Sequence, residues 1–143
     1  MTDLDQESIS VRIDQIRFSA RTLKDILGRG KQTFLGDPVL FSAAEHNMQI
    51  ASQAALDIAE HIITASGWEM AGSYRDVFRI LGKHGILDRD LAENMMALAG
   101  LRNILVHLYL QVKPDEFYEN IARGLEDLER YCLIIIQYLE SLN

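Results

Sequence analysis

Cysteine, proline and long hydrophobic runs are scarce in this sequence of 143 residues, which has one cysteine, Cys132, and two prolines. A lone cysteine excludes an internal disulfide framework and is typical of proteins in the reducing cytoplasm. We therefore expect a cytoplasmic protein in which Cys132 is a small buried hydrophobe. No apolar stretch has the length of a membrane span, and the acidic N-terminus has no apolar segment of a signal peptide. We expect no contact with a membrane.

Several familiar patterns are also missing. No alternating strand pattern, internal repeat, low-complexity run or long linker is present, so residues 1–143 are predicted to form one domain. There is no Cys–His cluster, no His-Glu-x-x-His motif and no glycine-rich phosphate loop flanked by a strand. We therefore expect neither a bound metal nor a cofactor.

The charge is acidic overall but unevenly distributed. A net charge of −7 is unusual for a protein that binds nucleic acid, because phosphate backbones attract basic surfaces. The asymmetry permits RNA binding on one side, and the acidic flank suits a basic partner equally well. The first segment is locally basic, through Arg12, Arg17, Arg21, Lys24, Arg29 and Lys31. The stretch from Asp115 onward is acidic, through Glu116, Glu119, Glu126, Asp127, Glu129 and Glu140.

Apolar residues recur at helical spacing in four long segments and one short one. Gly28 and Gly30 form a flexible connector after the first, and the many alanines of the second favour close packing against a neighbouring helix. The pattern predicts an all-α bundle of four long helices and one short helix. The expected helices are residues 9–27, a helix from Pro38 to near Gly67, a short one from Ser73 to Gly82, one that Asp88 caps and Lys113-Pro114 breaks, and one from Pro114 to Leu142.

The segment Arg102-Asn103-Ile104-Leu105-Val106-His107-Leu108-Tyr109 places polar groups in an otherwise apolar helix. Burying an unpaired charge is costly, so these groups must be paired or used. At about 100° per residue, Arg102 and Tyr109 project from nearly the same side, whereas Arg102 and His107 lie roughly 140° apart. One straight helix cannot direct all these groups at one atom. Two copies related by a two-fold axis can, which suggests a dimer with a shared cleft.

The residue types suit RNA cleavage without a metal. Histidine titrates near neutral pH, so His107 can take the proton of a 2′-hydroxyl, and the guanidinium of Arg102 can hold phosphate oxygens. Asn103 can orient His107 or bind substrate, while the phenol of Tyr109 can contact substrate or be modified. The alternative is a polar helix–helix interface in which Arg102 pairs with a carboxylate.

The pattern Arg-x-x-x-x-His-x-Tyr, with Asn after the Arg, resembles the signature of the HEPN superfamily and in particular that of HepT toxins. The order of segments 74–81, Gly85-Ile-Leu and 96–103 is also similar to that family, over nearly the whole chain. One departure is Leu108, where many relatives carry a polar residue. That position is variable within the motif.

The resemblance implies a dimeric HEPN-type helical bundle that acts as a metal-independent endoribonuclease, the toxin of a type VII-like toxin–antitoxin pair. Arg102 and His107 would form the catalytic site at the dimer cleft, supported by Asn103 and Tyr109, with messenger or transfer RNA as substrate. The partner would be a minimal nucleotidyltransferase antitoxin that adds AMP to Tyr109. A second hypothesis is a non-catalytic HEPN module that docks a nucleotidyltransferase or binds nucleotide.

Overall fold

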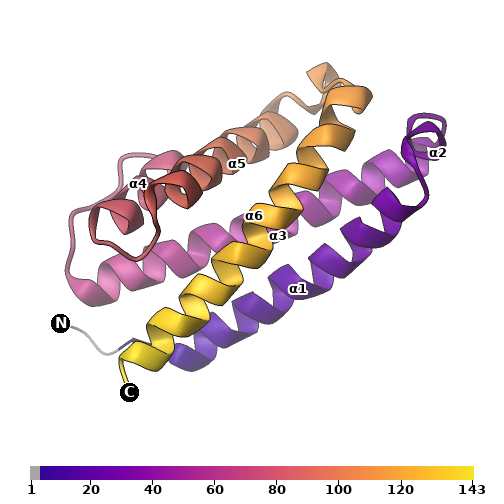
Figure 1. The fold of residues 1–143 in the computed structure, drawn as a ribbon. Helices are drawn as coiled ribbons and strands as arrows, with labels where there is room; N and C mark the ends of the chain where they lie inside the picture. Colours follow the sequence, from indigo (N-terminus) through magenta and orange to yellow (C-terminus); the bar gives the residue numbers. More distant parts are fainter. Residues whose placement is uncertain (1–3) are drawn as a thin grey trace.

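The computed structural model describes residues 4–143, apart from the side chain of Tyr109, and these residues form helices and no strands. Four long helices and the short helix α4 make a bundle in which α3 runs beside α1 and passes behind α6 (Figure 1). This confirms the predicted all-α bundle. The helices are α1 (Gln6–Gly28), α2 (Lys31–Leu35), α3 (Pro38–Ser66), α4 (Tyr74–Lys83), α5 (Arg89–His107) and α6 (Pro114–Ser141), with a 3-10 turn, η1, at Tyr109–Gln111.

The connector after α1 contains the helix α2, which the sequence pattern did not predict. Gly30 precedes it with a φ of 91°, a left-handed backbone conformation that glycine adopts without strain. The buried side chain of Phe34 then packs against Phe41 and Tyr118, with ring centroids 6.1 and 5.3 Å apart. Five residues are too few to show helical periodicity, so only these tertiary contacts reveal the element.

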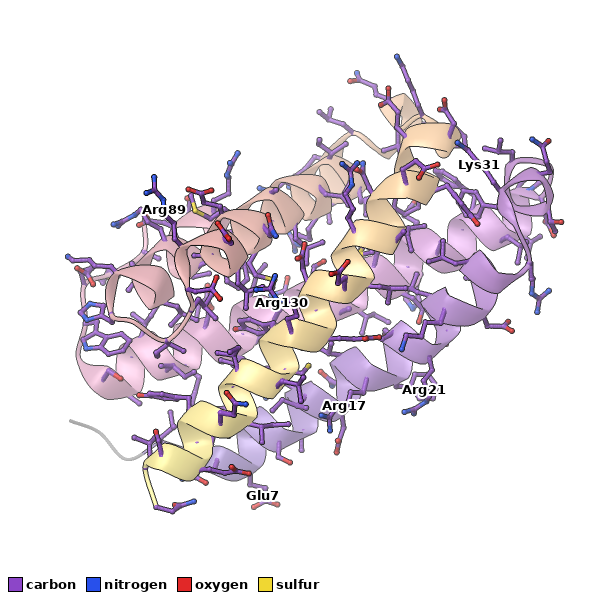
Figure 2. All side chains as sticks on the ribbon, viewed as in Figure 1. Glu7, Arg17, Arg21, Lys31, Arg89 and Arg130 are labelled. Carbon is purple, nitrogen blue, oxygen red and sulfur yellow. The ribbon has the colours of Figure 1, made fainter. Side chains whose placement is uncertain are left out.

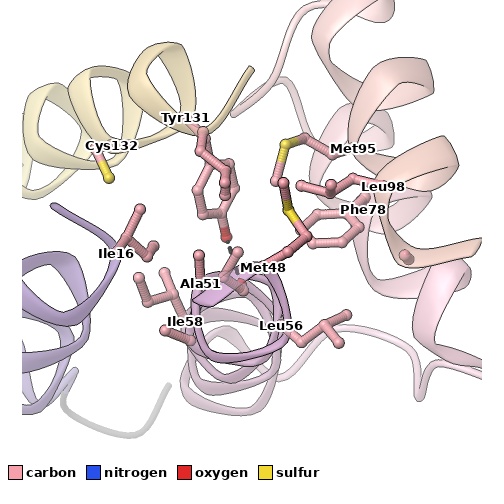
Figure 3. Close-up of a cluster of buried hydrophobic side chains, with 14 of the residues drawn as sticks. Ile16, Met48, Ala51, Leu56, Ile58, Phe78, Met95, Leu98, Tyr131 and Cys132 are labelled. Atoms are coloured by element: carbon pink, nitrogen blue, oxygen red, sulfur yellow. Dashed lines mark hydrogen bonds between the residues drawn. The ribbon is translucent and has the colours of Figure 1, made fainter. Parts of the chain in front are cut away.

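Helix α3 packs against α1, α4, α5 and α6, as its alanine content predicted. Small buried side chains such as Ala51 and Ala55 let these neighbours approach it closely. The buried Tyr131 of α6 lies between α6 and α3. It donates a hydrogen bond to the carbonyl oxygen of Ala55 at 2.8 Å, beside the ring of Phe78 (Figure 3). Cys132 is buried as expected, and burial raises the pKa of its thiol to about 11.

The predicted helix starts are confirmed by their capping hydrogen bonds. The carboxylates of Asp37 and Asp88 accept from the backbone N–H groups of Val39 and Leu91 at 2.9 and 2.8 Å, and the Ser73 hydroxyl accepts from that of Asp76. Within the described part of the chain, no helix combines the length and the apolar character needed to cross a membrane.

Helices α4 and α5 are in close contact at Gly82. A Cβ atom added there would lie 2.9 Å from the Cβ of Ala92, and both atoms would belong to rigid helix backbones. We expect Gly82→Ala to lower the free energy of unfolding by about 1–3 kcal/mol, as overpacking does. The free energies of unfolding of the two single variants and of the double variant Gly82→Ala/Ala92→Gly can be measured in urea. The decrease in the double variant should be smaller than the sum of the two single decreases by at least about 1 kcal/mol, because removing the Ala92 methyl group relieves the clash. Additive losses would contradict the close approach.

Candidate active site

Arg102 lies on the side of α5 that faces the core. It continues the stripe of buried residues formed by Leu91, Met95 and Leu98, and its own side chain is half-buried near the end of the helix. At this level the neighbouring helix α3 presents the polar residue Gln53 instead of an apolar side chain. An arginine is therefore tolerated at a core-facing position because the opposite helix supplies a hydrogen-bond acceptor.

The guanidinium of Arg102 is held by uncharged groups. Its Nη2 donates to Oε1 of Gln53 at 2.8 Å, and its Nη1 donates to Oδ1 of Asn103 at 3.3 Å. Its Cζ lies 4.7 Å from the ring centroid of Tyr74 in α4, a cation–π contact. Among residues 4–143, no carboxylate forms an ion pair with Arg102. The positive charge is thus fixed in place without being neutralised, which argues against the alternative of a pairing with a carboxylate.

A polar network extends from Arg102 across two further helices. The amide nitrogen of Gln53 donates to Oδ1 of Asp57 at 2.9 Å, and Oδ2 of Asp57 lies 3.6 Å from Nε of Arg12 in α1. Gln53, Asp57 and Tyr74 were not predicted to be site residues. A glutamine or tyrosine on a helix carries no local signal of function, and only the packing of α3 and α4 against α5 brings these side chains to Arg102.

His107 is the last residue of α5, and its side chain is exposed. Arg102 is half-buried and bonded to Gln53 of α3, whereas His107 is exposed, and helical geometry separates the two positions by about 140° around the axis. One copy of the chain therefore does not bring the two side chains together. Asn103 was expected either to orient His107 or to bind substrate, and in this structure it accepts a hydrogen bond from Arg102.

The predicted placement of Tyr109 on the same helix as Arg102 is wrong. Leu108 has φ −133° and ψ 29°, outside the helical region, so α5 stops at His107. Tyr109 begins the turn η1, where the N–H of Gln111 donates to the carbonyl of Leu108 at 2.8 Å. Helical periodicity consequently does not relate Tyr109 to Arg102, and the Tyr109 side chain is outside the part of the molecule that the structure describes.

The uneven charge read from the sequence is largely balanced within the fold. The acidic last helix supplies Glu129 to Lys24 and Glu119 to Lys31, while Asp57 and Asp25 pair with two arginines of the first segment. Of the basic residues in that segment, Arg17 and Arg21 have no ion pair with residues 4–143; both lie on the outer side of α1 (Figure 2). A continuous basic face along α1 is therefore absent from the described residues.

Metal-binding side chains do not gather in the described part of the chain. No three His, Cys, Asp or Glu residues among those described are placed to hold a metal ion. The chemical groups at the motif are instead a guanidinium, an amide and an imidazole.

Comparisons with known proteins identify the family of this chain. The family model described as Ribonuclease HepT-like matches residues 16–135. The mRNA nuclease HepT of Shewanella oneidensis is 30% identical over 124 residues, covering 87% of this chain and 92% of that protein. The tRNA nuclease HepT of Aphanizomenon flos-aquae is 29% identical over 151 residues, covering 100% of this chain and 97% of its own.

The fold is shared with a solved structure of a tri-AMPylated Shewanella oneidensis HEPN toxin in complex with MNT antitoxin. The TM-score is 0.84 at 29% identity, over 96% of this chain and 99% of that one. The resemblance to HEPN and HepT proteins predicted from the sequence is confirmed, and so is the predicted ribonuclease class. This chain belongs to the HepT-like ribonuclease family.

Proposed function

We propose that this chain, acting as a single HEPN domain over residues 1–143, is the toxin of a toxin–antitoxin pair and cuts RNA without a metal at a site shared by two copies. The observation that carries the proposal is the guanidinium of Arg102, which is half-buried, held by Gln53 and Tyr74, and not paired with a carboxylate of residues 4–143. Such a group is a prepared site for an anion, and in RNA that anion is the phosphate.

Each motif residue has a role in the proposed reaction. His107 takes the proton of the 2′-hydroxyl, the 2′-oxygen forms a bond to phosphorus, and the bond from phosphorus to the 5′-oxygen breaks. The leaving 5′-oxygen receives a proton from water or from a second imidazole. Arg102 has more N–H donors than its contacts with Gln53 and Asn103 use, so it can still donate to the phosphate oxygens as charge develops on them.

A dimer is favoured by the surroundings of His107. Val106, Leu108 and Leu110 are 38%, 48% and 85% exposed, which leaves an apolar surface beside the motif. A second copy that covered this surface would gain hydrophobic contact. It would also be able to present its own His107 to Arg102, whereas in one chain Arg102 bonds to Gln53 of α3 and His107 is exposed.

The proposed partner is a minimal nucleotidyltransferase antitoxin that adds AMP to Tyr109, and the proposed substrate is messenger or transfer RNA. The structural relative is AMPylated and in complex with an MNT antitoxin, and the two HepT relatives are mRNA and tRNA nucleases. The cytoplasm is the compartment where such an RNA substrate and a reduced Cys132 would be found.

Loss of either catalytic side chain should abolish cleavage. We expect His107→Ala and Arg102→Ala each to reduce the rate by about 10²- to 10⁴-fold, because a positioned acid–base group or charge donor is lost. Cleavage of RNA by the purified chain is the measurement, and it should be unaffected by EDTA. Activity that EDTA removes and magnesium restores would contradict the metal-free mechanism.

Mixing the two inactive variants tests the shared site. If Arg102 of one copy works with His107 of the other, a mixed dimer retains one intact site and partial activity returns. If both groups come from one chain, every site in the mixture lacks a group and no activity returns. Co-refolded variants, with each variant refolded alone as the control, distinguish these results.

The contacts of Arg102 lead to a prediction for Gln53. Gln53→Met removes the acceptor of the Arg102 hydrogen bond while conserving volume, and a hydrogen bond to a charged group contributes about 1.5–3 kcal/mol. We expect a loss of cleavage of roughly 10-fold or more, with an unchanged pH profile because His107 is intact. Gln49→Met, one turn earlier on the same face of α3, should cleave like the wild type, since Gln49 bonds to Glu45. Equal activities of the two variants would show that Gln53 does not position Arg102.

Tyr109 is the predicted site of modification. Incubation with the cognate nucleotidyltransferase and ATP should add the mass of AMP to the wild-type chain and leave Tyr109→Phe unchanged, as read by intact-protein mass spectrometry. Because Tyr109 follows His107 by two residues, the added phosphate would bring negative charge next to the motif, and the purine would occupy space there. Full neutralisation of an unmodified chain would instead assign control to complex formation alone.

A further inference from the structure

A groove with a volume of about 610 Å³ runs between α5 and α6 on the outer side of the bundle. Its floor is apolar and includes Leu98, Leu101 and Ile104 of α5. Its rim is polar, with the amide side chains of Asn94 and Asn120. A flat apolar floor accepts the face of a nucleobase, and amides at the rim can donate to and accept from base edges.

Two guanidinium groups lie on the rim. Arg123 of α6 donates to Oδ1 of Asn120 at 2.7 Å, and Arg75 of α4 lies over Gly100, where an added Cβ would be 3.8 Å from its Nη1. Neither arginine forms an ion pair with any carboxylate of residues 4–143. Most of the other Lys and Arg residues form an ion pair. The two arginines therefore make this groove locally positive, although the protein has a net charge of −7.

The groove lies beside the candidate active site, because Leu101 and Ile104 of its lining flank Arg102 and Asn103 in α5. The consecutive residues Tyr74 and Arg75 contact α5 at different places, with Tyr74 stacked on Arg102 and Arg75 above Gly100. His107 follows Gly100 by seven residues, which on a helix is nearly the same side and about 10 Å further along the axis. A strand of RNA that lies in the groove would therefore extend toward His107.

We propose that this groove binds the single-stranded RNA substrate next to the scissile phosphate, with Arg75 and Arg123 contacting backbone phosphates and the apolar floor contacting a base. This inference rests on the proposed function, because it assigns a binding surface to the same reaction. Asp127 also lines the groove and accepts a hydrogen bond from Asn94 at 3.1 Å. Burial raises the pKa of its carboxyl, consistent with a site enclosed enough to strengthen charge interactions.

The test measures binding separately from cleavage. The probe is a short fluorescent RNA of mixed sequence that is 2′-O-methylated at every position, so that it cannot be cut, and its affinity is read by fluorescence anisotropy. We expect Arg75→Gln/Arg123→Gln to raise Kd by about 10- to 100-fold and to reduce the slope of log affinity against log salt by roughly 1.4 between about 50 and 200 mM NaCl. Arg17→Gln/Arg21→Gln removes the same charge from two arginines of α1 that form no ion pair within residues 4–143, and it should bind like the wild type.

A third variant changes the affinity in the opposite direction. Asp127→Asn removes a negative charge from the groove and keeps the shape of the side chain, so it should lower Kd by a few-fold. Opposite effects of the arginine and aspartate variants, with an unchanged α1 control, support a site for the phosphate backbone. Equal effects of the groove and α1 double variants would mean that net charge alone governs binding, and this would overturn the proposal.

The remaining outcomes separate this inference from the proposed function. If the wild type cleaves RNA and the groove variants bind the probe normally, the groove assignment is wrong and the function stands. If the groove variants lose binding although the wild type cuts no RNA, the groove stands and the catalytic proposal fails. Failure of the wild type to bind the probe overturns the groove assignment. The groove assignment would also be wrong if the groove variants are monomeric in sedimentation equilibrium but bind the probe with wild-type affinity. This face would then be a contact between two copies of the chain.

Discussion

The charge of Arg102 is stabilised by neutral groups, and the arrangement of the site depends on this interaction. A carboxylate in place of Gln53 would neutralise the guanidinium and weaken its attraction for a substrate phosphate. The amide oxygen of Gln53 and the ring of Tyr74 instead offset the cost of partial burial while leaving the positive charge in place. Because these two groups come from α3 and α4, the packing of three helices decides where the charge lies.

The alanine-rich surface of α3 makes this packing possible. Small side chains allow α5 and α6 to lie close to α3, and the bond from Tyr131 to the Ala55 carbonyl fixes α6 across it. Helix α4 contacts α5 at both ends, through Gly82 and Ala92 in its last turn and through Tyr74 and Arg102 in its first. The conformation of Arg102 is thus a consequence of helix spacing, which is set by residues outside the motif.

The distribution of ion pairs clarifies how an acidic protein can act on RNA. The acidic α6 pairs with Lys24 and Lys31 of the first segment, so folding neutralises part of the basic segment with part of the acidic one. The arginines that remain without a described carboxylate partner include Arg75, Arg102 and Arg123, all near α5. Local charge at the proposed site, and not the net charge of the chain, is what an RNA phosphate would encounter.

The sequence by itself determined the helical class, the four long helices and the helix starts at Asp37, Ser73 and Asp88, because these follow from local periodicity and capping. It also determined the family, through the order of residues from Arg102 to Tyr109. Helix α2 and the end of α5 at His107 were not predictable, since they depend on the burial of Phe34 and on the conformation of Leu108. The roles of Gln53 and Tyr74 were likewise decided only by tertiary structure, because hydrogen-bond and stacking partners far apart in sequence are fixed by helix packing.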